Sequence, residues 1–217
     1  MSGPVSRYAL PVYRPIAFAV DDHEALLTHA RAHPFATLVT SGPEASHLPL
    51  LVELRGERIV LRGHLARDNP QFASLARAGG EDALAIFHGP HGYVSPSVYI
   101  QHPSVPTWNY VVVHARGRAR LVDEAALRRI LDDMVARFDA TGWRFDAQTD
   151  YARHSLDAIA GFEIEVERLE GKWKLSQNRP LEDQRRVVEW LERGDDASRA
   201  TAAIMRERLA RPARPEG

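Results

Sequence analysis

Apolar and polar residues alternate over long stretches of this chain, most regularly in "NYVVVHARGRARLV", Asn109–Val122. Successive side chains of a β-strand point to opposite faces of a sheet. One face would be small and apolar, with Val111, Val113, Ala115, Ala119 and Leu121. The other face would be larger and basic, with Tyr110, Val112, His114, Arg116, Arg118 and Arg120. We predict a long strand whose apolar face fills the core of a small barrel and whose arginines lie outside, on a solvated face or against a partner.

Five further segments have the β-branched and aromatic residues, or the alternation, that are typical of strands. They are residues 35–40, 47–54, 58–65, 82–89 and 161–176. Pro49 places the second of these segments at a sheet edge or bulge, because proline has no N–H to donate to a neighbouring strand. The last segment carries turn-forming residues at Glu170-Gly171, so it is predicted to be a hairpin.

Apolar residues spaced three and four apart, together with capping signals, predict helices between and after the strands. The predicted helices cover residues 19–34, 69–80, 127–138, 150–160, 180–194 and 195–210. Asp21 and Asn69 are suited to cap the first two helices, and Pro34 and Gly79-Gly80 are suited to end them. The last seven residues, "RPARPEG", are predicted to form a disordered tail.

The order of these elements favours an α+β fold that is mainly β. Few strand–helix–strand units have the spacing of parallel crossovers. The sheet is therefore predicted to be mostly antiparallel and closed or nearly closed, with helices packed outside. A chain of 217 residues suits one domain, or one domain with an appendage.

Composition narrows the classes of function. The chain has no cysteine, which excludes disulfides, zinc–thiolate sites, iron–sulfur clusters and cysteine nucleophiles. The net charge is −1, so no overall field recruits nucleic acid or a membrane surface. No stretch approaches the ~20 apolar residues of a membrane span, and the N-terminus has no apolar signal core. We expect a cytoplasmic protein without a membrane partner.

A first polar cluster lies in "GHLARDNP", where a predicted strand ends and a predicted helix begins. Free N–H groups at a helix N-terminus bind phosphate well, and the fork of Arg67 could grip phosphate oxygens. His64 and Asn69 are close to Arg67 in the sequence. The cluster therefore suggests an anion site, with plain capping and a surface ion pair of Arg67 as the alternative.

A second cluster, "PTWN", stands at the entry of the long strand. Trp108 would supply a flat apolar wall, and Thr107 and Asn109 would supply hydrogen-bonding edges beside it. This mixture suits a planar heteroaromatic ligand. A packed loop is the alternative.

A third cluster, "GKWKLSQNR", follows the predicted hairpin. Lys172, Lys174 and Ser176 would share one face, and Gln177 adds an amide edge. Two cations and a hydroxyl in line suit an anion. An amphipathic edge strand with a solvated face is the alternative.

No set of residues predicts a metal or a catalytic centre. His29 and His33 are four residues apart on a predicted helix, but no carboxylate is placed to complete a metal site. The sequence contains no HExxH motif, nucleophile elbow, Walker loop or GxGxxG motif. We expect no metal, and we assign no catalytic residue.

Six segments, in chain order, resemble the PaiB family of FMN-binding negative transcriptional regulators. They are "FATLVT", "HLPLLVE", "GHLARDNPQF", "ALAIFHGPHGYVSPSVY", "VPTWNYVVVHARG" and "GFEIEVERLEGKWKLSQNRPLEDQRRVVEWL". The resemblance implies an antiparallel split β-barrel of the FMN-binding type, usually a homodimer with FMN in a groove at the subunit interface. We expect this domain to span residues 1–178. A C-terminal helical segment, residues 179–217, would pack on the barrel and end in a flexible tail.

The resemblance also implies that the three clusters serve one FMN site. His64, Arg67 and Asn69 would lie toward the phosphate, and Thr107, Trp108 and Asn109 near the ring or ribityl chain. Further contacts would come from Lys174, Ser176 and Gln177. One departure is Val98 in "SPSVY", where the family pattern has Trp; if that position lines the groove, the site is wider or weaker in this chain.

The function expected from the sequence is that of an FMN-binding, PaiB-like regulatory protein. Two alternatives stay open: a flavin-dependent oxidoreductase that uses FMN, and a split-barrel dimer that has lost flavin binding. Direct contact with DNA is not expected, because the chain has no recognisable DNA-binding motif. Residues 185–217 carry eight arginines and six acids, a net charge of only +2.

Overall fold

A computed structural model describes residues 12–144 and 149–210 of the chain; the tail predicted at residues 211–217 lies outside them. The chain divides into two compact units. The first unit comprises residues 23–87 and 114–169, and the second comprises residues 12–22, 88–113 and 170–210. The expected domain boundary at residue 178 stays a prediction. Among the described residues, none of the helices has the length and apolar character needed to cross a membrane.

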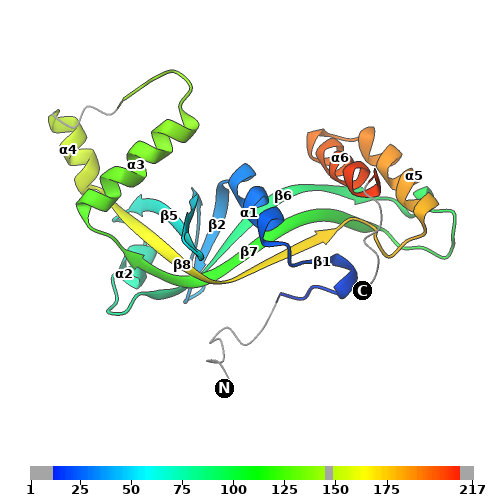
Figure 1. Cartoon of the computed structure of the whole chain (residues 1–217), viewed down its shortest axis with the longest axis horizontal. Helices are drawn as coiled ribbons and strands as arrows, with labels where there is room; N and C mark the ends of the chain where they lie inside the picture. The colour runs from blue at the N-terminus through cyan, green and yellow to red at the C-terminus, as the bar shows by residue number, and fades with distance from the viewer. Residues whose placement is uncertain (1–11, 145–148, 211–217) are drawn as a thin grey trace. The chain divides into compact units, whose positions relative to one another are not determined.

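The first unit contains four complete antiparallel strands and parts of three long strands that continue into the second unit (Figure 1). The strands are β2 (Phe35–Thr40), β3 (Ala45–Pro49), β4 (Leu51–Arg55), β5 (Arg58–Ala66), β6 (Glu81–Val94), β7 (Thr107–Leu121) and β8 (Ile159–Lys174). They are hydrogen-bonded in the order β3-β2-β6-β7-β8-β5-β4. The mainly antiparallel sheet with flanking helices confirms the predicted fold class.

The long strand β7 has the predicted alternation. Val111, Val113, Ala115 and Ala119 are buried, whereas the intervening residues from Tyr110 to Arg118 are half-buried and Arg120 is exposed. The small size of the inner residues allows close approach between neighbouring strands. Gly117 is the extreme case, because a Cβ atom at this position would lie 2.0 Å from the carbonyl oxygen of Glu165 in β8.

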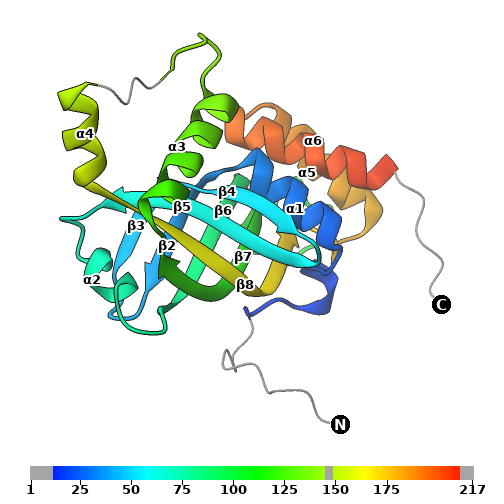
Figure 2. The same ribbon diagram turned by 60° about the vertical axis from the view of Figure 1, so that its left-hand side comes forward.

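Four helices belong to the first unit: α1 (His23–Ala32), α2 (Gln71–Leu75), α3 (Glu124–Phe138) and α4 (Asp150–Asp157). Helix α3 begins after Asp123, whose side chain accepts a hydrogen bond from the N–H of Ala126 at 2.8 Å. Ile130 and Met134 of its predicted apolar stripe pack on Leu51 of β4, so α3 lies against the outside of the sheet (Figure 2).

Some predicted boundaries differ from the structure. The segment 47–54 is two strands, β3 and β4, separated at Leu50, whose N–H donates instead to the carbonyl of Pro34 at 2.9 Å. Strands β3 and β4 stand at the two ends of the strand order, so the expectation of an edge at Pro49 is confirmed. Helix α2 has five residues and ends before the predicted stop at Gly79-Gly80.

The predicted hairpin at Glu170-Gly171 is wrong, because β8 runs through these residues without turning. Gly171 pairs with Val20 of β1 (Ala19–Val20), a strand distant in sequence. Glu170 is 3% exposed, and one of its carboxylate oxygens lies 3.5 Å from Nε of Arg14. The same pairing explains why the first helix begins at His23 instead of Ala19.

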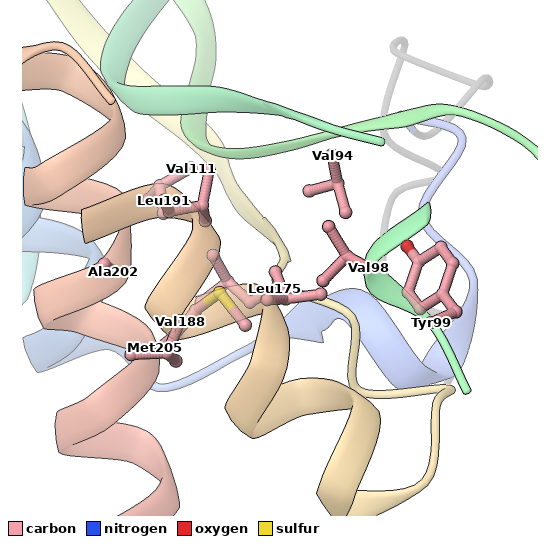
Figure 3. Packing of buried hydrophobic residues seen from close by; sticks show 10 residues of the cluster. Val94, Val98, Tyr99, Val111, Leu175, Val188, Leu191, Ala202 and Met205 are labelled. Carbon is pink, nitrogen blue, oxygen red and sulfur yellow. The ribbon is translucent and has the colours of Figure 1, made fainter. Parts of the chain in front are cut away.

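The second unit has its own hydrophobic core. It contains η1 (Ile16–Phe18), β1, η2 (Pro96–Val98), the adjoining ends of β6, β7 and β8, and the two predicted C-terminal helices, α5 (Leu181–Glu192) and α6 (Asp196–Ala210). Side chains from these strands and helices point toward one another in Figure 3. Val98 is one of them and is 8% exposed, so this residue fills core space and does not line an open groove.

Candidate functional site

A cavity of about 500 Å³ lies in the first unit, between the sheet and helices α3 and α4. Its lining residues are Pro49, His64, Leu131, Met134, Val135, Phe138, Asp139, Trp143, Ser155, Leu156 and Ile159. Most of these side chains are apolar, and a few polar groups stand among them. This size and this composition are typical of a small-molecule site.

His64 is the residue of the first predicted cluster that lines this cavity. It lies on β5 opposite Gly161 of β8. Burial lowers the pKa of its imidazole, so the ring is neutral at neutral pH. Its Nδ1 atom is buried and has no hydrogen-bond partner among the described residues. A neutral imidazole offers one donor and one acceptor, so His64 could bond to the polar edge of a ligand.

Asn69 is used by the turn that leads into α2. Its side-chain oxygen accepts a hydrogen bond from the N–H of Gln71 at 2.9 Å, as a helix cap does. Its amide nitrogen donates to Oγ of Ser46 at 2.8 Å. Asn69 therefore holds the loop that carries Arg67.

Arg67 is exposed, immediately after the end of β5. Its guanidinium carbon lies 5.3 Å from the centre of the Phe72 ring. Within residues 12–144 and 149–210, the side chain of Arg67 has no carboxylate partner. The alternative predicted for Arg67, an ion pair with a surface carboxylate, is therefore not found among these residues. Because α2 has only five residues, its dipole is small, and Arg67 is the main group of this segment that could hold an anion.

The second and third predicted clusters meet in the second unit. A cavity of about 200 Å³ is lined by Phe18, Tyr99, Val105, Thr107, Asn109, Lys174, Ser176, Asn178 and Arg179. Four of these residues, Thr107, Asn109, Lys174 and Ser176, were candidates from the sequence. The structure brings them together although more than sixty residues separate the two clusters.

Direct hydrogen bonds join the two clusters. The ammonium of Lys174 donates to the hydroxyl of Thr107 and, at 2.6 Å, to the carbonyl of Trp108. The amide nitrogen of Asn109 donates to the hydroxyl of Ser176 at 3.0 Å, and Asn109 is completely buried. Ser176 has a φ of 62°, an uncommon value for a residue other than glycine, and this turn directs the chain away after β8.

Two other candidates lie outside that cavity. The ring of Trp108 is 51% exposed and lies 5.5 Å from the ring of His91 and 6.1 Å from the ring of Tyr93. The amide of Gln177 bonds within its own turn, accepting from the N–H of Leu175 at 2.6 Å and donating to the carbonyl of Trp173. Gln177 therefore stabilises the turn after β8.

Sequence reasoning missed two groups of lining residues. Arg179 lines the smaller cavity with its guanidinium 4.3 Å from the centre of the Tyr99 ring, and its place directly after "KLSQN" was the available signal. In the larger cavity, the apolar stripe on α3 indicated only a helix. Leu131, Val135 and Phe138 continue that stripe into the cavity wall. The expectation that all nine candidates share one pocket stays a prediction. The candidates of the first cluster, around His64, belong to the first unit, whereas those of the other two clusters belong to the second unit.

Comparison with known proteins places the chain in a family. A family model described as "Putative FMN-binding domain" matches residues 12–168. The chain is 32% identical to "Protease synthase and sporulation protein PAI 2" of Bacillus subtilis (strain 168) over 206 residues, which cover 91% of this chain and 98% of that protein.

Two solved structures resemble the chain at lower identity. The flavocytochrome Anf3 from Azotobacter vinelandii superposes with a TM-score of 0.55 at 20% identity, covering 72% of this chain and 69% of that one. The FAD and heme binding protein from Mycobacterium smegmatis superposes with a TM-score of 0.57 at 18% identity, covering 76% and 78% of the two chains. At these identities the likeness shows the fold.

Proposed function

The chain belongs to the FMN-binding domain family, and from this we propose that it is an FMN-binding, PaiB-like regulatory protein that holds the flavin in the cavity of its first unit. The observation that carries the location is the cavity of about 500 Å³, whose wall combines apolar side chains with the imidazole of His64. All its lining residues fall within the segment that the family model matches.

The residues present suit FMN. The isoalloxazine ring is flat and mostly apolar on its faces, and the aliphatic and aromatic walls from α3 and α4 suit such faces. The ring edge carries nitrogen and carbonyl groups, to which the neutral imidazole of His64 can bond. Arg67, three residues further along the chain, is the residue that we propose holds the phosphate, through two N–H groups of its guanidinium. Bound FMN supplies redox chemistry, whereas the chain supplies binding and orientation.

A regulatory role is preferred to an enzymatic one. The Bacillus subtilis relative is named for protease synthesis and sporulation, which supports regulation. A flavin-dependent oxidoreductase stays the second candidate, because FMN would supply redox chemistry when bound. Formation of a homodimer stays a prediction from the family resemblance, and so do the assignments of Thr107, Trp108, Asn109, Lys174, Ser176 and Gln177 to the flavin.

The visible spectrum of the purified full chain tests FMN binding. We expect the two absorption bands of oxidised flavin to appear in fresh material, or after addition of FMN and removal of the excess. A chain that stays colourless after this treatment contradicts the proposal.

Addition of NADH or NADPH to the loaded protein separates the two candidates, because rapid bleaching favours the oxidoreductase and a stable spectrum favours the binding role.

A further inference from the structure

Two cations of the second unit line the same small cavity, and no described carboxylate forms an ion pair with either of them. Lys174 and Arg179 both line the cavity of about 200 Å³. Neither side chain forms an ion pair with a carboxylate within the part of the chain that the structure describes. Two buried carboxylates of this unit contact other groups. Asp183 accepts the N–H of Ile100 at 2.8 Å, and Glu170 lies 3.5 Å from Arg14.

The polar groups of the cavity leave donors open toward its interior. An ammonium has three N–H donors, and Lys174 uses two of them on Thr107 and Trp108. The hydroxyl of Thr107 accepts the bond from Lys174, so its own hydrogen remains available to donate. The guanidinium of Arg179 stacks on the ring of Tyr99 at 4.3 Å, which leaves its N–H edge free.

The surroundings of Lys174 are short of negative charge. Burial, and then the nearby cations of Lys172 and Arg179, lower the pKa of its ammonium. An anion bound between Lys174 and Arg179 would remove this repulsion and provide the charge partner that the described residues do not supply.

The size of the cavity limits the ligand. Its volume of about 200 Å³ is smaller than the roughly 300–1,000 Å³ of sites for drug-sized molecules. A flavin ring system is therefore too large for it, whereas a phosphate group or a short carboxylate is not. Phe18, Tyr99 and Val105 add an apolar wall beside the cations.

We propose that this cavity binds a compact oxyanion, either a small carboxylate or a phosphate group, with Lys174 and Arg179 as its charge partners and Thr107 as a hydroxyl donor. The site lies within the second unit, so it does not depend on the flavin site proposed for the first. The proposed anion is a free molecule, because the phosphate of FMN is assigned to Arg67 in the first unit.

The test uses the flavin-free full chain and isothermal titration at constant ionic strength. The probes are inorganic phosphate, acetate and FMN, each in a chloride background. We expect the wild type to bind one equivalent of phosphate or acetate. Lys174→Met should weaken this binding about 10- to 100-fold, because it removes a charge-assisted hydrogen bond. Arg179→Gln should act in the same direction, and it decides the question if Lys174→Met does not fold.

Lys172→Met is the matched control. Lys172 lies two residues from Lys174 on the same strand, and its ammonium donates to the carbonyl of Tyr13 at 2.8 Å. It does not line the cavity, so the control should bind the anion as the wild type does. Equal weakening in Lys172→Met, unchanged affinity in both cavity variants, or binding of neither phosphate nor acetate overturns the proposal.

The three probes distinguish the sources of the anion. Binding of phosphate or acetate that depends on Lys174 identifies a free anion. Binding of FMN alone, lost in Lys174→Met and retained in Arg67→Ala, would instead place the flavin phosphate here and contradict its assignment to Arg67. An Arg67→Ala variant should bind phosphate and acetate normally, so failure of the anion site and failure of the flavin site give different results.

Discussion

Replacing Arg67 by alanine is expected to weaken FMN binding about 10- to 100-fold, because charge-assisted hydrogen bonds contribute roughly 1.5–3 kcal/mol each. Arg67 is exposed and has no carboxylate partner among the described residues, so its loss leaves no buried charge. The free energy of unfolding should therefore change little. Titration of the flavin-free chain with FMN, followed by flavin fluorescence, gives the dissociation constant.

Arg58→Ala is the control for that experiment. Arg58 begins the same strand, β5, and its guanidinium lies 3.3 Å from the carboxylate of Glu165 in an exposed ion pair. Exposed ion pairs of this kind contribute little to stability. The control should retain wild-type affinity for FMN. Equal affinities of wild type and Arg67→Ala would remove Arg67 from the phosphate site.

Replacing Gly117 by alanine is expected to lower the free energy of unfolding by about 3 kcal/mol, near the upper end for overpacking in a core. The added Cβ would lie 2.0 Å from the carbonyl oxygen of Glu165 and 2.8 Å from its carbonyl carbon. These are backbone atoms of the neighbouring strand, so they cannot move aside as a flexible side chain could. Urea unfolding monitored by circular dichroism measures the loss.

Gly56→Ala provides the comparison for Gly117→Ala. Gly56 has a φ of 63°, and a Cβ at this position meets nothing within 4 Å. The cost is then limited to backbone strain, about 1–2 kcal/mol. If both variants lose the same stability, the close approach of β7 and β8 at Gly117 is not a packing constraint.

The elements that the sequence predicted well are those defined by local periodicity. The alternation from Tyr110 to Arg120 is a property of neighbouring residues, and it placed the inner face of β7 correctly. The stripe on α3 depends equally on local spacing. The error at Glu170-Gly171 has the opposite cause, because turn-forming residues there were outweighed by pairing with β1, about 150 residues earlier in the chain. No local pattern reports such a partner.

The candidate site residues show the same difference between local patterns, which the sequence reveals, and contacts between distant segments, which it does not. Residue types and spacing identified Thr107, Asn109, Lys174 and Ser176, and the structure shows them in one cavity. Sequence reasoning could not find the apolar walls, because Phe18 and Tyr99 reach the smaller cavity from distant segments. Gln177 and Asn69 show the limit of choosing residues by type. Both have suitable polar groups, but the structure uses these groups to hold turns.

The indole N–H signals of the four tryptophans test the location of the flavin most directly. Trp143 lines the cavity of the first unit, whereas Trp108, Trp173 and Trp190 belong to the second unit. Two-dimensional NMR of the ¹⁵N-labelled full chain during titration with FMN follows all four signals at once. We predict that the Trp143 signal shifts and saturates as FMN binds. A shift of Trp108 with an unchanged Trp143 signal would contradict a flavin site in the first unit.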